Sequence, residues 1–503
     1  MSSSHRWATF CVITIIYVAL PNIYYPPFLS PNDLSRLRLT RALLETHSFR
    51  IDPYVGHPSP DRVGDLSFYG GHFYSDKAIG LSLAAVPPLA ILHLFVPHAS
   101  IFTMLFAARF FTVTLPALIA LWVILKRCRS SFGIVAVVGL YLGSVIFPQA
   151  LSFNGHVPMT LAICTAAALV GRTELRDAHF ALAGLLSGVA ILLDFTSAIA
   201  AAALLLLVAV RTRSIRKSVL FGLCCAAIAS VQLFVNAYYF GGPLDFAYHH
   251  MFNPADQANR AGAFFGIGLA KFDAVVGLTF GRMRGMFVHS PFLLLAIPAI
   301  FAAVAPGKRD PVRRWAIAVC GAYFYLNAAL ADWEGGWSLG PRYLTLIYPL
   351  LTYLLVDWYE RVASERWRKV WEPLLMLSVT WSVLLHLASM TTWSMPPPLK
   401  FLSFPALQIS AFLIFHGAYA PNLLVWIGLP VAFAVALLVL LALGAMIMNG
   451  GLRSVPTVAV AALLFTIALS RAVPPEGSAT ARLFDVFLID MGYDDHPVSS
   501  RSS

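Results

Sequence analysis

Residues 30–80 read SPNDLSRLRLTRALLETHSFRIDPYVGHPSPDRVGDLSFYGGHFYSDKAIG, and this stretch decides how the rest of the chain is interpreted. It is the first long polar segment, and it holds six carboxylates in a chain that is 59% hydrophobic. Charged groups are costly to bury without partners, so this many stay together only in contact with water. We therefore expect this stretch to be an outer loop that carries function.

Composition sets the fold class. Only 12% of the 503 residues are charged, and the mean hydropathy is +0.75. Apolar runs of about 17–25 residues recur, which is the length that crosses a bilayer. A soluble globule is excluded because too few polar residues exist to cover one. A β-barrel is excluded because the runs are continuous and do not alternate. The sequence predicts an all-α fold, a polytopic transmembrane helical bundle.

The formal net charge of +11 does not point to nucleic acid, because the Lys and Arg residues cluster in short links between apolar runs. Such links mark the cytoplasmic side, and their alternation predicts about thirteen spans. We expect residues 7–28 to form the first span, with the N-terminus in the cytoplasm. Residues 78–97 contain Pro87 and Pro88, and we expect them to re-enter the membrane or to form a broken helix at the outer face.

The expected organisation has one catalytic module and a C-terminal extension. The module covers residues 1–360, further transmembrane helices cover residues 361–470, and residues 471–503 form an extracytoplasmic tail. Leucines at helical spacing in the first outer loop predict short interfacial helices there. The expected outer loops of the module are residues 30–78, 241–290 and 332–342.

Three aspartates of the first outer loop are candidate general bases. A carboxylate at the membrane boundary can accept the proton of a hydroxyl group during group transfer. For Asp33 there is a structural alternative, which is capping the N-terminus of the helix that follows it. The three candidates are Asp33, Asp65 and Asp76.

Cationic and aromatic residues near the outer ends of spans are candidates for holding a sugar phosphate. Lys77 follows the turn predicted at Gly70-Gly71 and offers a point charge, although a surface ion pair is the alternative. An arginine inside an apolar run, such as Arg109, faces a cavity or a partner unless it snorkels to the interface. Tryptophans at an interface are commonly belt residues. The substrate-binding candidates are His72, Lys77, Arg109, His156, Arg284, Trp333, Glu334 and Arg342.

The motifs follow one another in a definite order. They are YSDKAIG (74–80), RFFTVTLPA (109–117), FNGH (153–156), FGGP (240–243), RGMFVHSP (284–291) and WEGGWSLGPRY (333–343). In this order the chain resembles the GT-C superfamily of integral-membrane glycosyltransferases. Within it, the chain is most similar to the bacterial branch of protein O-mannosyltransferases and aminoarabinose lipid A transferases. The resemblance covers residues 1–360.

The resemblance implies transfer of a sugar from a polyprenyl-phosphate donor to a lipid, glycan or protein acceptor at the extracytoplasmic face. It also implies that an acidic residue of the first outer loop activates the acceptor, which by position is Asp33. The mannosyltransferase branch has an acidic pair here, whereas this chain has Asn32 before Asp33, so Asp65 and Asp76 stay open as bases. The basic residues that match the lipid-phosphate ligands by position are Lys77, Arg109 and Arg342.

Two other functions stay open, namely a transporter or flippase of lipid-linked sugars and a structural membrane subunit. Transport predicts charged or unwound helices at mid-bilayer, whereas the candidate residues here lie in outer loops. A structural subunit leaves the motifs unexplained. We therefore expect a hexosyl- or pentosyltransferase of the inner (plasma) membrane that uses a polyprenyl-phosphate sugar. No cofactor is predicted; the outer loops hold enough carboxylates for a divalent metal, but without a recognisable ligand spacing.

Overall fold

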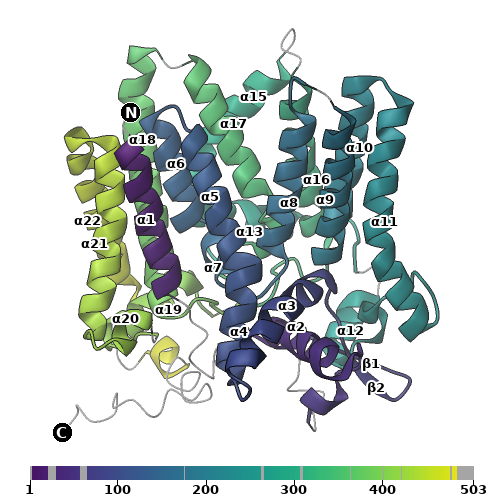
Figure 1. Ribbon diagram of the computed structural model, residues 1–503. Coiled ribbons are helices and arrows are strands. Elements are labelled where there is room, and N and C mark those ends of the chain that lie inside the picture. The colour runs from purple at the N-terminus through teal and green to yellow at the C-terminus, as the bar shows by residue number, and fades with distance from the viewer. Residues whose placement is uncertain are drawn as a thin grey trace, which may run out of the picture.

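The computed structural model describes residues 3–20, 30–56, 65–174, 176–261, 266–305, 310–362, 364–399, 401–420, 422–475 and 478–483. Helices that stand side by side form the body of the molecule, and α4, η5 and α5 run on as one of them over Ile101–Arg127 (Figure 1). They are α1 (Ser3–Ala19), α4 (Ile101–Arg109), η5 (Phe110–Thr114), α5 (Leu115–Arg127), α6 (Ser131–Leu142), α8 (His156–Val170), α9 (Asp177–Leu193), α10 (Ser197–Thr212), α11 (Ile215–Phe240), α16 (Pro311–Ala329), α17 (Ile347–Val362), α18 (Glu365–Thr391), α21 (Val431–Gly450) and α22 (Val455–Ala472).

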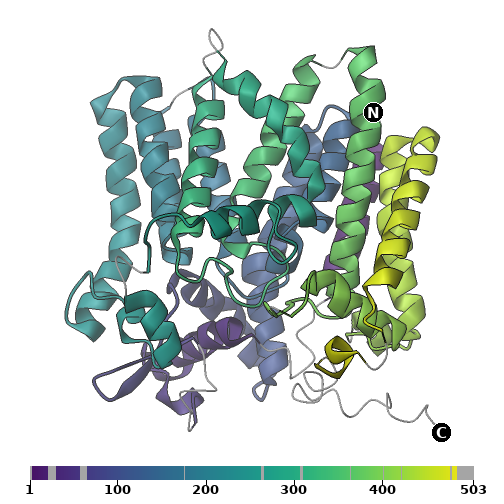
Figure 2. The same cartoon turned by 180° about the vertical axis from the view of Figure 1, so that it is seen from behind.

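Shorter elements connect these helices and gather mainly at the lower end in Figure 1. They are α2 (Pro31–Arg41), η3 (Ala42–Thr46), η4 (Asp52–Tyr54), β1 (Leu66–Tyr69), β2 (His72–Ser75), α3 (Gly80–Phe95), α7 (Ile146–Ala150), η6 (Ala247–His250), α12 (Pro254–Ala261), α13 (Phe272–Thr279), α14 (Met286–His289), η7 (Pro291–Ala296), α15 (Ile297–Val304), η8 (Arg342–Leu344), α19 (Pro405–Phe415), α20 (Leu423–Trp426) and η9 (Leu452–Ser454). Figure 2 shows α13 and its neighbours crossing in front of the long helices on the opposite face.

The chain is a multi-pass helical membrane protein. In the described ranges, five helices are long and apolar enough to cross a bilayer, and seven further apolar helices have 10–17 residues. The expected number of about thirteen spans stays a prediction. Helix α1 ends at Ala19, and residues 21–28 of the expected first span lie outside the described residues. Most of the expected tail, residues 484–503, also lies outside them.

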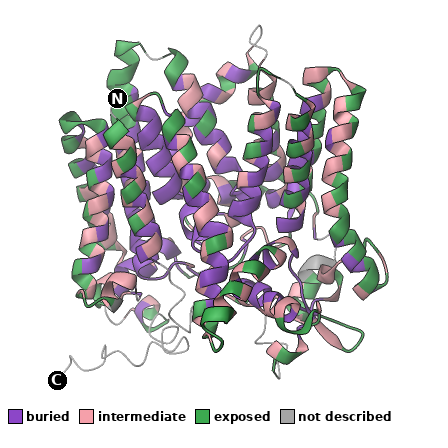
Figure 3. Cartoon of the chain, viewed as in Figure 1, coloured by how far each residue is buried: buried purple, intermediate pink, exposed green. Residues whose placement is uncertain are grey.

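Burial distinguishes the centre of the bundle from its lipid-facing rim (Figure 3). In α6, every residue after Ser131 is buried. In α11, by contrast, large apolar side chains such as Leu223 and Phe234 are exposed. Exposed apolar side chains on a long helix are the expected surface towards hydrocarbon, because lipid removes the penalty that water would impose.

Helices α9 and α11 approach each other closely through glycines. Gly184 and Gly188 are four residues apart and therefore share one face of α9. A Cβ atom at Gly188 would lie only 2.6 Å from the carbonyl oxygen of Cys225, and one at Gly184 would collide with that of Phe221. This is the small-residue packing that lets transmembrane helices gain van der Waals contact.

The first outer loop folds at the lower end of the bundle, where α2, α3 and the β1–β2 hairpin lie together (Figure 1). The strands pair antiparallel, with Tyr69 opposite His72. Gly70 and Gly71 have φ of 58° and 84°, as a two-residue type I′ turn requires. The glycine pair thus forms the predicted tight turn, and its two strands are an addition to the expected all-α fold.

Two elements of this loop differ from expectation. Helix α3 runs unbroken through Pro87 and Pro88, so residues 78–97 do not form a broken helix. Helix α2 is not an interfacial helix with its polar side in water. Its buried residues are Asn32, Asp33, Ser35, Arg36, Leu37, Leu39 and Thr40. The polar residues turn inward because they meet other polar groups there.

Candidate active site

Helix α2 places Asp33 at the centre of a polar cluster. The N-cap of this helix is Ser30, with Pro31 following it, so Asp33 does not cap α2. Asp33 instead accepts a hydrogen bond at Oδ2 from the backbone N–H of Phe153, at 3.1 Å. Its other oxygen, Oδ1, has no hydrogen-bond partner among the described residues. The residue is 8% exposed, so this oxygen is the free acceptor of a buried carboxylate.

Burial raises the pKa of Asp33 from 3.8 to about 6. The Phe153 hydrogen bond and the positive charges of Arg36, Arg109 and Arg342 act in the opposite direction without cancelling it. A carboxyl group with a pKa near the working pH is suited to accept a proton, because it is ionised and still basic. Among the three candidate bases, Asp33 combines this property with an oxygen that no described residue bonds.

Asp65 and Asp76 are both bound to the Lys77 ammonium group. The Nζ atom of Lys77 lies 2.6 Å from Oδ1 of Asp65 and 2.7 Å from Oδ2 of Asp76. Burial opposes the charge of Lys77, but these two carboxylates raise its pKa above the ordinary value. Burial alone would raise the pKa of Asp65, yet Lys77 holds it below the ordinary range. Asp65 is therefore a paired anion and not a ready base.

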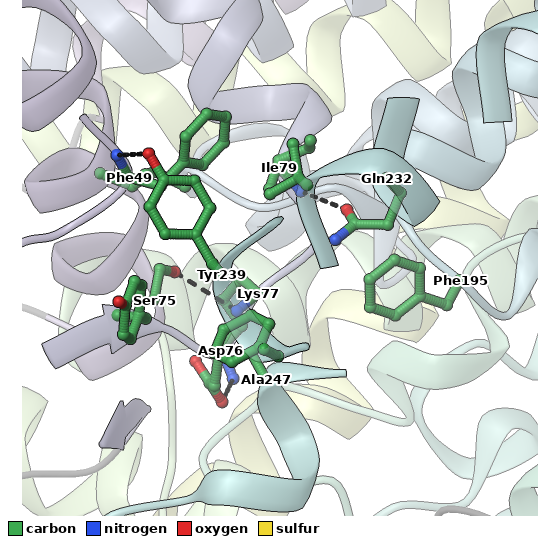
Figure 4. Close-up of a pocket in the computed structure, with 13 residues that line it drawn as sticks. Phe49, Ser75, Asp76, Lys77, Ile79, Phe195, Gln232, Tyr239 and Ala247 are labelled. Carbon is green, nitrogen blue, oxygen red and sulfur yellow. Dashed lines mark hydrogen bonds and ion pairs between the residues drawn. The ribbon is translucent and has the colours of Figure 1, made fainter. Parts of the chain in front are cut away.

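Asp76 and Lys77 also line a small cavity, together with residues of α11 such as Gln232 (Figure 4). It has a volume of about 20 Å³, which is room for about one water molecule. Gln232 projects towards it and accepts a hydrogen bond from the Ile79 backbone N–H at 3.4 Å. The Ser75 hydroxyl accepts another from the Lys77 backbone N–H at 3.3 Å. These bonds fix the backbone that carries Asp76 and Lys77.

Arg109 and Arg342 bring positive charge to the cluster from distant parts of the chain. Arg109 is 1% exposed, donates to the Leu151 carbonyl at 3.3 Å and precedes the π-helical turn η5. It is thus buried among protein atoms and does not snorkel. Arg342 lies in η8 with its guanidinium carbon 5.3 Å from the centre of the Tyr343 ring. Both arginines act on Asp33, which places them within electrostatic reach of it.

His156 begins α8 and forms a second pair in the same region. Its Nδ1 atom lies 2.8 Å from Oδ2 of Asp194, and its ring centre lies 5.9 Å from that of Tyr343. Asp194 follows the last residue of α9 and also accepts hydrogen bonds from the backbone N–H and hydroxyl of Thr196.

Arg284 does not have the role that its sequence suggests. Its guanidinium donates to five backbone carbonyls, with distances from 2.5 to 3.4 Å. A guanidinium has five N–H donors, so none is left for an anionic head group. Arg284 instead holds the loop of residues 334–338 in place. The carbonyls that accept belong to Met283, Glu334, Gly336, Ser338 and Pro396.

Three other candidates contribute less directly. His72 sits beside the hairpin turn and pairs with Asp52 at 3.3 Å, with 38% of its side chain exposed. It does not join the Asp33 cluster. Trp333 packs its ring against Gly277, and Glu334 meets Arg284 through its backbone carbonyl. These two residues shape the loop that leads to Arg342.

The structure adds two residues that the sequence interpretation missed, Arg36 and Asp194. Arg36 is 6% exposed, donates to the side chain of Asn32 and acts on Asp33. Its signal was its position three residues after Asp33, one helical turn on, which places both on the same face of α2. Across the described part of the chain, no group of three His, Cys, Asp or Glu residues is arranged to hold a metal ion.

No protein-family model matches the chain, and no curated protein sequence matches it significantly. Solved structures do. The crystal structure of ArnT from Cupriavidus metallidurans in the apo state superposes with a TM-score of 0.52 at 14% identity, covering 93% of this chain and 75% of that one. The chain has the fold of ArnT. The structure of ArnT bound to undecaprenyl phosphate gives the same TM-score of 0.52 at 13% identity, covering 92% and 75%.

ArnT is an aminoarabinose lipid A transferase of the GT-C type. The resemblance drawn from the order of motifs is therefore confirmed at the level of the fold. The match to ArnT extends over 93% of this chain, beyond the residues 1–360 to which the motifs were confined.

Proposed function

We propose that the protein is a glycosyltransferase that moves a sugar from a polyprenyl-phosphate donor to a hydroxyl or amine of a lipid, glycan or protein acceptor. Asp33 accepts the acceptor's proton as the new glycosidic bond forms. The bond between the sugar and the phosphate breaks, and the polyprenyl phosphate leaves as an anion. Cations placed beforehand near that phosphate stabilise the charge that develops on it.

The observation that carries this proposal is the contrast between Asp33 and the other two acids. Asp33 is buried, has a pKa of about 6, and has one oxygen without a hydrogen-bond partner in the described part of the chain. Asp65 and Asp76 both have an oxygen occupied by the Lys77 ammonium group. One acid is thus left basic beside Arg36, Arg109 and Arg342, which is the arrangement that proton abstraction next to an anionic leaving group needs.

The fold supports a lipid-linked donor. The ArnT structure that shares this fold has been solved with undecaprenyl phosphate bound. A donor of this kind keeps its chain in the bilayer, and extracting it would cost about 0.8 kcal/mol per methylene group. A site at the end of a helical bundle avoids that cost. We assign donor binding to Lys77, Arg109 and Arg342.

Position favours catalysis over transport or flipping. Helix α2, which carries Asp33, and the β1–β2 hairpin, which lies between Asp65 and Asp76 in the sequence, are at one end of the bundle (Figure 1). A transporter of lipid-linked sugars would need its polar residues near the bilayer centre. We place this end at the extracytoplasmic face of the inner membrane and the N-terminus in the cytoplasm, following the positive links.

The test is sugar transfer by purified protein in liposomes, using radiolabelled undecaprenyl-phosphate-linked mannose, arabinose and 4-amino-arabinose with a bacterial lipid extract as acceptor. We expect Asp33→Asn to lower turnover by at least about 100-fold, the usual size of a general-base contribution, while binding of undecaprenyl phosphate is retained. The matched control is Asp177→Asn, which changes a partly exposed acid that pairs with Arg216.

Full activity of Asp33→Asn would move the base to Asp65 or Asp76. Accelerated flipping of the labelled lipid by wild-type protein, with no transfer from any donor, would replace the proposal by the transport function.

A further inference from the structure

The Asp194–His156 pair engages one nitrogen of the imidazole ring, Nδ1, and leaves the other nitrogen, Nε2, without a partner among the described residues. Nδ1 of His156 faces Asp194 at 2.8 Å. Nε2 has no hydrogen-bond partner among the described residues, and 11% of the His156 side chain remains exposed. The ring is therefore fixed on one side and available on the other.

The proton on this ring can be placed from its partner. Burial would raise the pKa of Asp194, but the hydrogen bonds from His156 and Thr196 lower it to about 2. An ionised carboxylate only accepts hydrogen bonds, so Nδ1 of His156 must carry the proton it donates. Burial lowers the pKa of His156, and although the hydrogen bond and charge of Asp194 act in the opposite direction, the positive charges of Arg342 and Arg36 add to the lowering. The ring is then neutral, and Nε2 presents a lone pair.

The backbone brings this pair to the Asp33 site. Gly155 packs so closely against the carbonyl oxygen of Leu193 that a Cβ atom there would collide with it. This contact puts His156 beside Asp194 at the end of α9. Three residues earlier, Phe153 donates its backbone N–H to Asp33. The same segment thus carries the partner of the proposed base and the open imidazole.

We propose that Nε2 of His156 accepts a hydrogen bond from a hydroxyl group of the donor sugar and that Asp194 is the positioning residue that fixes the required tautomer. This rests on the proposed function. Phosphate oxygens are acceptors, so a lone pair on Nε2 has nothing to bond on them, whereas a sugar hydroxyl is a donor. His156 then selects for the sugar, while Lys77 and the arginines hold the phosphate.

The test compares two ligands that differ only in the sugar. Binding of bare undecaprenyl phosphate and of undecaprenyl-phosphate-linked arabinose is measured for wild type, His156→Ala, His156→Gln and Asp194→Asn. We expect His156→Ala and Asp194→Asn to weaken binding of the sugar-linked lipid about fivefold, the usual effect of one neutral hydrogen bond. Binding of the bare lipid should change less than about twofold in both variants.

His156→Gln should recover part of the loss, because its amide oxygen is also an acceptor. The control is His179→Ala, at a half-buried histidine in the first turn of α9, at the opposite end of that helix from Asp194. Asn at position 194 can donate to Nδ1 and so favours the opposite tautomer. Asp194→Asn is thus expected to act like the loss of the ring itself.

Equal weakening of both ligands would overturn this inference, because His156 would then act on the phosphate or on the fold. So would unchanged binding of both. A wild-type protein that binds neither lipid and transfers no sugar would overturn the proposed function as well. Transfer by wild type with sugar selectivity intact in His156→Ala would leave the proposed function standing and remove only this step.

Discussion

Asp33 and Lys77 show what burial does to single charges at this site. Lys77 keeps its charge because two carboxylates surround it, whereas burial of Asp33 is not fully offset and raises its pKa to about 6. The form that accepts a proton is the carboxylate, which is lost as pH falls through this pKa. We expect single-turnover transfer to fall about tenfold per pH unit below pH 6. A midpoint near pH 4 would contradict an Asp33 base in this environment.

The raised pKa of Asp33, which favours activity, is expected to lower the stability of the folded protein. A carboxyl group whose pKa is raised on folding destabilises the folded state wherever it is ionised, which is above about pH 6, and this cost disappears as pH falls towards 4. Asp33→Asn should therefore raise the thermal unfolding temperature at pH 8 while it removes activity. Inactivity with gained stability cannot be explained by misfolding.

Arg284 offers a second prediction for a single residue. Arg284→Lys replaces five donors by three and leaves carbonyls of the 334–338 loop unpaired, so we expect a loss of about 2–3 kcal/mol in unfolding free energy. Transfer should weaken with it, because the loop leads to Arg342. Arg282→Lys is the control at an exposed neighbour. If the Arg284→Lys variant were stable but failed to bind undecaprenyl phosphate, Arg284 would be a phosphate ligand after all.

Residue types single out part of the candidate site. Asp33, Lys77 and Arg109 stand out in the sequence because charges beside or within apolar runs need a reason. Arg36 and Asp194 do not stand out: Arg36 looks like the polar side of an amphipathic helix, and Asp194 looks like a link residue. Asp194 acquires its role from a tertiary contact with His156, which no local pattern encodes. Arg36 meets Asn32 within one turn of α2, so its spacing is visible in the sequence, but the burial of that side of the helix is not.

At the scale of elements, the contact of α9 with α11 depends on small residues. Gly188 lets α9 touch α11, where a Cβ would lie 2.6 Å from the Cys225 oxygen. We expect Gly188→Leu to force these helices apart and to lower the thermal unfolding temperature in detergent. The unfolding free energy should fall by about 1–3 kcal/mol, as is usual for overpacking. Gly222→Ala is the control, since nothing lies within 4 Å of a Cβ there. Equal stability of both variants would contradict close packing.

The sequence predicts those secondary-structure elements whose conformation depends on local residues alone. The Gly70-Gly71 turn follows from positive φ angles alone. The four-residue strands beside it carry no clear alternation, and α3 keeps its helix through two prolines because neighbouring α2 and α4 pack on it. Packing of this kind outweighs the helix-breaking tendency of proline, and a single sequence does not display it.

At the scale of the whole molecule, the two ends of the bundle have different chemistry. The N-terminus lies at the upper end in Figure 1, and the β1–β2 hairpin lies at the lower end. In intact cells, we expect a membrane-impermeant maleimide to label Tyr69→Cys and not Ser214→Cys, because positive links such as that of Ser214 remain in the cytoplasm. Labelling of Ser214→Cys alone would invert the proposed orientation.

Two motif glycines meet the end of α9 at successive residues. A Cβ at Gly80 would lie 2.5 Å from the Leu192 oxygen, and Gly155 contacts the Leu193 oxygen in the same way. The segments that carry Lys77 and His156 therefore both pack on the same short stretch of backbone at the end of α9. A thinner or thicker bilayer tilts helices relative to one another, yet these segments would move as a unit. We expect the Michaelis constant for the donor to stay constant across liposomes of different acyl-chain length, and Gly80→Ala to make it depend on that length.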